Sequence, residues 1–81
     1  MRITVKFFAS ARERARASEM QLELADGADV AAAAEDLARQ VTALGGYLDR
    51  VAFAVNRNYV HRQARLADGD ELAVIPPVSG G

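Results

Sequence analysis

Residues 29–46, DVAAAAEDLARQVTALGG, are the one stretch of this sequence with the periodicity of a long helix. Apolar residues recur in it at steps of three and four, which places one apolar stripe on about four helical turns. Asp29 suits the N-cap because its carboxylate can accept amide hydrogens of the first turn, and Gly45-Gly46 predicts a left-handed C-cap. The stretch therefore predicts a single amphipathic helix that must pack on another layer. Its expected buried stripe is Val30, Ala34, Leu37, Val41 and Leu44.

Strand patterns lie on both sides of this helix. Residues 2–8 and 19–24 alternate between inward apolar and outward positions, which predicts two half-buried strands that pair antiparallel. Residues 10–18 between them are small or charged and predict a solvated loop or one to two turns of helix. After the helix the sequence predicts three more strands, an apolar internal one, a short edge strand and a last one. These are residues 51–55, 59–61 and 72–75.

This order predicts an α+β domain in which one main helix covers one face of a mixed sheet of about five strands. A right-handed crossover through the helix places the last strand parallel to the first and beside it. The arrangement is the β-grasp, the ubiquitin-like fold. At 81 residues the chain is large enough for one core and too short for two, so residues 1–81 form a single domain.

Composition excludes several classes of function. The chain has no cysteine, so disulfides, thiolate metal sites and cysteine nucleophiles are absent from it. Its net charge of −1 gives no electrostatic reason to expect nucleic acid or an anionic membrane as a partner. There is no apolar run of membrane-spanning length and no signal-peptide pattern, so we expect a cytoplasmic protein. His61 is the only histidine and has no second ligand near it in the sequence, and no metal site is predicted.

The end of the sequence is a short arm, residues 76–81. Pro76 and Pro77 lack amide donors, so the last strand should stop before them. The arm ends in Gly80-Gly81, where nothing but backbone precedes the carboxylate, and such an end can pass through a channel too narrow for side chains. We interpret Gly81 as the reactive residue and its carboxylate as the functional group. The alternative is a frayed end without function.

Several segments together resemble the small subunit of molybdopterin synthase, a sulfur carrier of the ubiquitin-like family. The resemblance extends over nearly the whole chain, and only the helix and its neighbouring loops are generic. The segments that carry it are Val5-Lys6-Phe7-Phe8-Ala9 with Arg12-Glu13, Ala54-Val55-Asn56, Leu66-Ala67-Asp68-Gly69-Asp70-Glu71-Leu72 and Pro76-Pro77-Val78-Ser79-Gly80-Gly81.

The resemblance implies a role in molybdenum cofactor biosynthesis. A partner similar to the ubiquitin-activating enzymes would use ATP and Mg²⁺ to adenylate the Gly81 carboxylate, and sulfide would then displace AMP to leave a thiocarboxylate. The charged carrier would dock on the large catalytic subunit and give its sulfur to cyclic pyranopterin monophosphate, which builds the dithiolene. The family complex is a heterotetramer, two carriers on a dimer of large subunits. The carrier would bind no cofactor stably and would not be catalytic on its own.

The docking surface is predicted from alternation as well as from the resemblance. Phe8 and Ile75 should project from the sheet face opposite the helix, with Tyr59 beside them, and Arg12 is a candidate contact at the rim. The alternative is that residues 10–18 cover Phe8 and Ile75. The resemblance adds the arm itself, which would enter the partner's active site through Pro76, Pro77, Val78 and Ser79.

Other functions remain open from sequence. A sulfur carrier for thiamine synthesis also ends in diglycine and is charged in the same way, although such chains tend to lack the long arginine-rich connection of residues 10–18. A carrier for another sulfur-transfer pathway differs only in its acceptor. A protein modifier would use the same adenylate to join Gly81 to a lysine of another protein. A non-reactive adaptor would use the face around Phe8 alone.

Overall fold

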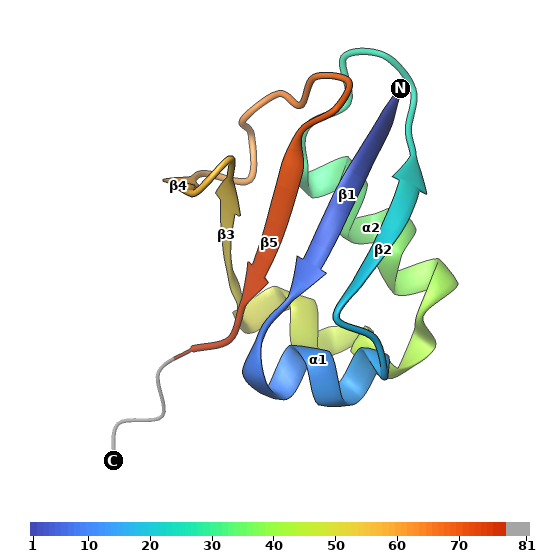
Figure 1. Cartoon of the computed structure of the whole chain (residues 1–81), viewed down its shortest axis with the longest axis vertical. Coiled ribbons are helices and arrows are strands. Elements are labelled where there is room, and N and C mark those ends of the chain that lie inside the picture. Colours follow the sequence, from blue (N-terminus) through green and yellow to red (C-terminus); the bar gives the residue numbers. More distant parts are fainter. Residues whose placement is uncertain (78–81) are drawn as a thin grey trace.

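The computed structural model describes residues 1–77, which form a five-stranded sheet, two α-helices and two short 3₁₀ helices (Figure 1). The 3₁₀ helices, Thr42–Leu44 and Gly46–Arg50, connect the second α-helix to the third strand. Within these residues no helix is both long and apolar enough to cross a bilayer. The other elements are β1 (Arg2–Phe7), α1 (Ala9–Ala15), β2 (Glu19–Glu23), α2 (Val30–Gln40), β3 (Ala52–Val55), β4 (Asn58–Val60) and β5 (Glu71–Ile75).

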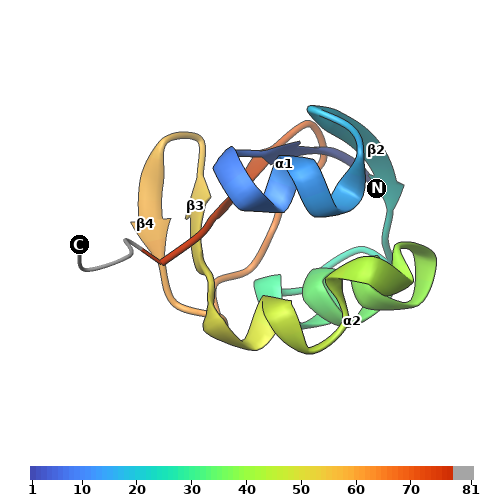
Figure 2. The same ribbon diagram turned by 90° about the horizontal axis from the view of Figure 1, so that it is seen from below.

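The strand order in the sheet is β2-β1-β5-β3-β4. β1 and β5 are parallel neighbours, as predicted, and all other neighbouring pairs are antiparallel. α2 lies across one face of the sheet, and α1 lies at the end where β1 and β5 finish (Figure 2). The predicted β-grasp architecture is therefore confirmed, and the chain continues toward Gly81 from β5, the middle strand of the sheet.

The core lies between the sheet and α2. Side chains of β1 and β5 that point toward α2 are almost completely buried, and they meet Val30 and Leu37 of α2, which are 0% exposed. Burial of such side chains contributes about 1.5–3 kcal/mol each. Asp29 caps α2 as predicted, because its carboxylate accepts a hydrogen bond of 2.9 Å from the amide of Ala32. The sheet residues of this core are Ile3, Val5, Phe7, Leu22, Phe53, Leu72 and Val74.

The prediction for the end of α2 was wrong. We expected the helix to continue through Leu44 and to end on a left-handed glycine, but α2 ends at Gln40 and its C-cap is Val41. Val41 has a non-helical backbone (φ −121°, ψ 86°), and Gly45 has φ −5°, outside the left-handed region. The stripe was nevertheless correct, since the 3₁₀ turn after Val41 still brings Leu44 into the core with 0% exposure.

The connection between β1 and β2 contains helix α1, the second of the two predicted alternatives. Ala11 is fully buried and packs the helix onto the domain. The helix ends at Ala15. Its C-cap, Arg16, has φ 57°, and the Arg16 amide donates to the carbonyl of Arg12 at 2.9 Å. A left-handed conformation is unfavourable for a non-glycine residue. The hydrogen bond from Arg16 and the burial of Ala11 offset this cost and hold α1 against the domain.

The turn between β3 and β4 is fixed by a polar network. Asn56 and Arg57 both have positive φ, 49° and 72°, as a tight two-residue hairpin turn requires. The Asn56 side-chain amide donates to Asp70 at 3.0 Å, and its carbonyl oxygen accepts from the amide of Glu71 at 3.0 Å. These bonds tie the β3–β4 hairpin to the start of β5, so the turn holds Tyr59 and Arg57 at one edge of the sheet.

Candidate functional site

Three of the predicted docking residues, Phe8, Tyr59 and Ile75, lie on the sheet face opposite α2. Phe8 is 47% exposed and Tyr59 is 73% exposed, and they are the two exposed large hydrophobic side chains of the described residues. Ile75 is half-buried on the same face, at the end of β5. α1 begins directly after Phe8 and leaves it exposed. The alternative in which residues 10–18 cover Phe8 is therefore wrong.

A shallow hollow of about 530 Å³ lies on this face, which we call the open face. Its floor follows from strand register, because Lys6 of β1 pairs with Ala73 of β5, and Ala73 pairs in turn with Ala54 of β3. Ala54 pairs with Tyr59 of β4, which completes one row across four strands. Two small side chains in the middle of the row leave a depression between larger ones. The lining residues are Lys6, Phe8, Ala54, Arg57, Tyr59, Glu71, Ala73 and Ile75.

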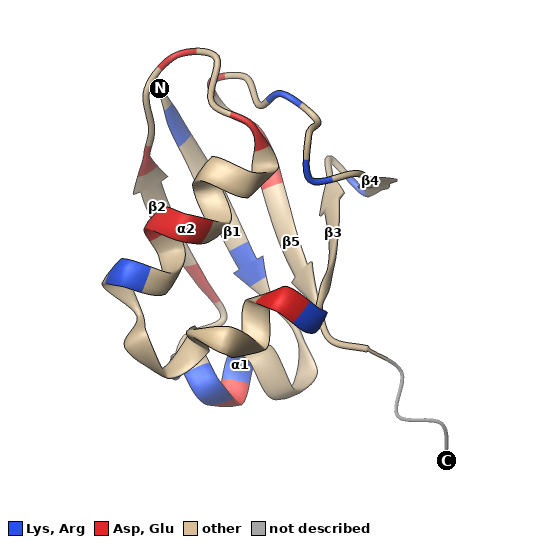
Figure 3. Ribbon diagram, turned by 180° about the vertical axis from the view of Figure 1, so that it is seen from behind, with Lys and Arg blue, Asp and Glu red and all other residues tan. Residues whose placement is uncertain are grey.

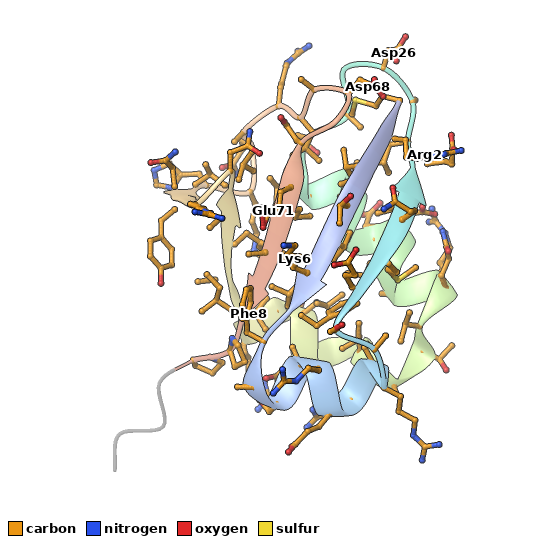
Figure 4. The ribbon with its side chains drawn as sticks, viewed as in Figure 1. Arg2, Lys6, Phe8, Asp26, Asp68 and Glu71 are labelled. Carbon is orange, nitrogen blue, oxygen red and sulfur yellow. The ribbon has the colours of Figure 1, made fainter. Side chains whose placement is uncertain are left out.

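An ion pair lies within the hollow. The ammonium of Lys6 is 3.4 Å from a carboxylate oxygen of Glu71, and both side chains remain partly exposed. Figure 4 shows Lys6, Glu71 and Phe8 on the same side of the sheet, with Phe8 nearest the end of β5. The open face thus combines apolar side chains at one end with charged groups at the other, the composition expected of a protein interface rather than of a catalytic centre.

The arginines of α1 have different surroundings. Arg12 is exposed one helical turn after Phe8, which agrees with a place beside the open face. Arg14 instead lies over the ring of Tyr47, 4.3 Å from its centroid, and the hydroxyls of Ser10 and Tyr47 are hydrogen-bonded. Seen from behind, α1 shows basic positions beside an acidic one (Figure 3). We conclude that Arg14 helps to hold α1 against the segment that contains Tyr47.

The arm is described only in part. Pro76 is half-buried and Pro77 is exposed, and β5 ends at Ile75 as the two prolines predicted. The predicted contacts of Val78 and Ser79, and the reactive role of Gly80 and Gly81, fall outside the described residues. They remain predictions.

Sequence reasoning missed the charged part of the hollow. Lys6 was predicted only as a strand position, and Glu71 lies just before the predicted last strand. Both otherwise occur only in the segments that carry the resemblance, and Arg57 was assigned no part in the docking surface. Alternation along β1 does place Lys6 on the same face as Phe8. The row that joins Lys6 to Tyr59, however, depends on how four strands are aligned, and no local pattern specifies that alignment.

Comparison with known proteins identifies the family. The ThiS family model matches residues 5–81. The molybdopterin synthase sulfur carrier subunit of Chlamydomonas reinhardtii is 46% identical to this chain over the full length of both. The subunit of the same name from Mycobacterium tuberculosis is 32% identical over 100% of this chain and 99% of its own length.

Solved structures agree with the fold. SAMP1 of Haloferax volcanii, small archaeal modifier protein 1, superposes with a TM-score of 0.91 at 28% identity over 100% of both chains. A chain of the Helicobacter pylori complex of subunits 1 and 2 of molybdopterin-converting factor has a TM-score of 0.66 at 24% identity, again over 100% of both chains, which shows a shared fold. From the family model and the curated relatives, the chain belongs to the ThiS family, among the sulfur carrier subunits of molybdopterin synthase.

Proposed function

We propose that the Gly81 carboxylate carries the sulfur as a thiocarboxylate. An adenylating enzyme similar to the ubiquitin-activating enzymes supplies ATP and Mg²⁺, so the carrier itself needs no cofactor. A carboxylate oxygen of Gly81 attacks the α-phosphate of ATP and pyrophosphate leaves, which gives an acyl-adenylate. Sulfide then attacks the acyl carbon and AMP leaves, so one C–O bond is replaced by one C–S bond without a redox change.

The charged carrier then docks on the large subunit of molybdopterin synthase. The arm delivers the thiocarboxylate into that subunit's active site, where the sulfur is transferred to cyclic pyranopterin monophosphate. Each dithiolene needs two sulfur atoms, so two charging events serve each product. The Chlamydomonas reinhardtii relative is named as a subunit of molybdopterin synthase, which supports a partner of this kind.

The observation that carries this proposal is the position of the open face beside the end of β5. Phe8 and Ile75 line the same hollow, and Ile75 is the last residue of β5. A partner that covers the hollow therefore meets the chain at the point from which it continues toward Gly81. Exposed aromatic side chains of this type commonly anchor protein interfaces, so an apolar surface beside the end of β5 supports docking of a partner that receives the C-terminal arm.

The test is the intact mass of the protein after incubation with ATP, Mg²⁺, sulfide and the adenylating enzyme of the same organism. The wild type should gain the mass difference between sulfur and oxygen, and a variant without Gly81 should not. An Arg39→Met variant, changed on the far side of α2, is the matched control and should gain the same mass. An unchanged wild-type mass, with the enzyme active on another carrier, would contradict the proposal.

A second candidate function is protein modification. The likeness to small archaeal modifier protein 1 favours it, because the same acyl-adenylate could pass the Gly81 carbonyl to a lysine amine instead of to sulfide. Cells that express the protein distinguish the two functions. A modifier forms higher-mass conjugates that contain the whole chain, and these disappear when Gly81 is deleted. A dedicated carrier forms the thiocarboxylate and no conjugates.

A further inference from the structure

The charges of the open face are not balanced. Three of the eight lining residues are charged, Lys6 and Arg57 positively and Glu71 negatively. Lys6 and Glu71 form the ion pair of 3.4 Å. Within residues 1–77, no carboxylate lies within ion-pair distance of Arg57. The hollow therefore carries one positive charge in excess.

The side chains of this ion pair are partly exposed, so solvent can reach the donors and acceptors that the pair leaves unused. The side chains of Lys6 and Glu71 are 39% and 29% exposed, and the ammonium of Lys6 has three donors, of which the contact with Glu71 uses one. A partner that covers the hollow excludes this solvent. Burial of an incompletely paired charge is costly, so the covering surface must supply acceptors of its own.

From this we propose that the large subunit of molybdopterin synthase presents a carboxylate to Lys6 when it covers the open face, and that Arg57 adds the excess positive charge that attracts it. The inference rests on the proposed carrier function and adds the chemical character of the partner's surface. A backbone carbonyl could satisfy a donor of Lys6, but only an anion also cancels the excess charge of the hollow.

The row of paired residues across the sheet also indicates where the partner's carboxylate should lie. Lys6 stands at one end of the row and Tyr59 at the other, with the small side chains of Ala73 and Ala54 between them. Phe8 and Ile75 border the row on the side where β5 ends. The complementary surface therefore has an apolar side chain over the two alanines and its carboxylate beside the β1 end of the row.

The test measures the dissociation constant between the carrier and the large subunit over a range of salt concentrations. Lys6→Met keeps the length of the side chain and removes the charge. Since a hydrogen bond to a charged group contributes about 1.5–3 kcal/mol, this variant should bind at least about tenfold more weakly and should respond less to salt. Arg39→Met removes a positive charge from α2, which covers the sheet face opposite the open face (Figure 3), and should bind like the wild type.

Glu71→Gln distinguishes this proposal from an indirect role of Lys6. If Lys6 mattered only because it holds Glu71 in place, Glu71→Gln would weaken binding as much as Lys6→Met does. Under the proposal it leaves Lys6 free for the partner's carboxylate, so binding should be unchanged or tighter. Arg57→Asn, which suits the positive φ of that position, should weaken binding by a few-fold and provides a second variant should Lys6→Met not fold.

Two results would overturn the inference alone. One is a Lys6→Met variant that binds with wild-type affinity and wild-type salt dependence. The other is an equal loss in Lys6→Met and Glu71→Gln. A wild-type carrier that acquires sulfur at Gly81 but does not bind the large subunit would instead overturn the proposed acceptor, and this inference with it.

Discussion

The two faces of the sheet are made from alternate residues of the same strands, yet they differ in burial and in charge. On the face toward α2, Phe7 is 2% exposed and Val74 is 0% exposed, inside a continuous apolar core. On the open face, Phe8, the residue directly after the end of β1, is 47% exposed and borders a hollow that contains an ion pair. Adjacent residues thus serve different purposes, Phe7 stability and Phe8 recognition. Substitutions at the two positions can therefore measure the two effects separately.

The largest effect is expected from Phe7→Ala. This change removes a buried ring and leaves a cavity between the sheet and α2, which costs about 3–5 kcal/mol. Domains of this kind are stable by only about 5–15 kcal/mol, so the variant should be close to unfolding at ambient temperature. Urea denaturation followed by circular dichroism measures the loss. A loss below about 1 kcal/mol would show that the covered face is not the main source of stability.

The second effect is expected from Phe8→Ala, the same change one residue later. Its free energy of unfolding in urea should stay within about 0.5 kcal/mol of the wild type, because the ring is half exposed and borders the open face. Binding to the large subunit should weaken by at least about 2 kcal/mol, roughly thirtyfold, as for an aromatic anchor in an interface. Isothermal titration calorimetry measures this. Wild-type affinity in the variant would remove Phe8 from the docking surface.

The third test changes the attachment of α2 and leaves both sheet faces intact. Asp29→Ala removes the hydrogen bond from the Ala32 amide and should cost about 1 kcal/mol. Affinity for the large subunit should not change, since α2 lies on the opposite side from the open face. Asp29→Asn serves as the control and should restore most of the stability, because asparagine is also a good N-cap. A change in affinity would mean that the two faces are coupled.

The smallest effect is expected at the edge of the sheet, away from both the core and the hollow. Arg2 and Glu23 form an ion pair of 2.7 Å, but their side chains are 66% and 68% exposed. Exposed pairs of this kind contribute little, so Arg2→Gln should change the free energy of unfolding by no more than about 0.5 kcal/mol. Thermal denaturation at low and high salt checks this. A loss of several kcal/mol would show that the edge pair is structurally important.

The assignment of residues to the two faces could be predicted from sequence. Alternation along β1 and β5 separates Phe7 and Val74 from Phe8 and Ile75, and the structure confirms each position. The parallel pairing of β1 with β5 follows from the right-handed crossover rule. These features depend on local periodicity and on chain topology, which a single sequence contains.

The end of α2 could not be predicted in the same way. The stripe continues through Val41 to Leu44, and Gly45-Gly46 follows at a suitable distance for a C-cap. The non-helical backbone at Val41 nevertheless ends the helix after Gln40. A 3₁₀ turn then places Leu44 in the core, and the next one buries Tyr47 and Leu48. Tertiary packing determines where the helix ends, and helical periodicity alone does not contain this information.

The hollow could not be predicted from the sequence, for a related reason. Its floor exists because Ala73 and Ala54 are cross-strand neighbours, which is a property of register between strands far apart in the chain. The position of Arg57 depends on the positive φ values of the β3–β4 turn. The reactive role of Gly81 was predicted from the diglycine end and the resemblance, and it remains a prediction that the mass measurement tests.

The central place of β5 has a consequence for folding kinetics. β1 and β2 form one antiparallel pair and β3 and β4 another, and every hydrogen-bonded ladder between these two pairs passes through β5. Neither pair alone makes a stable sheet in water. The rate-limiting step should therefore be the insertion of β5, the last strand in the sequence, between the two pairs, and the contacts formed in that step are far apart in sequence. The hollow draws its lining from β1, β3, β4 and β5 and exists only after that insertion. An incompletely folded carrier therefore has no surface on which a partner could dock.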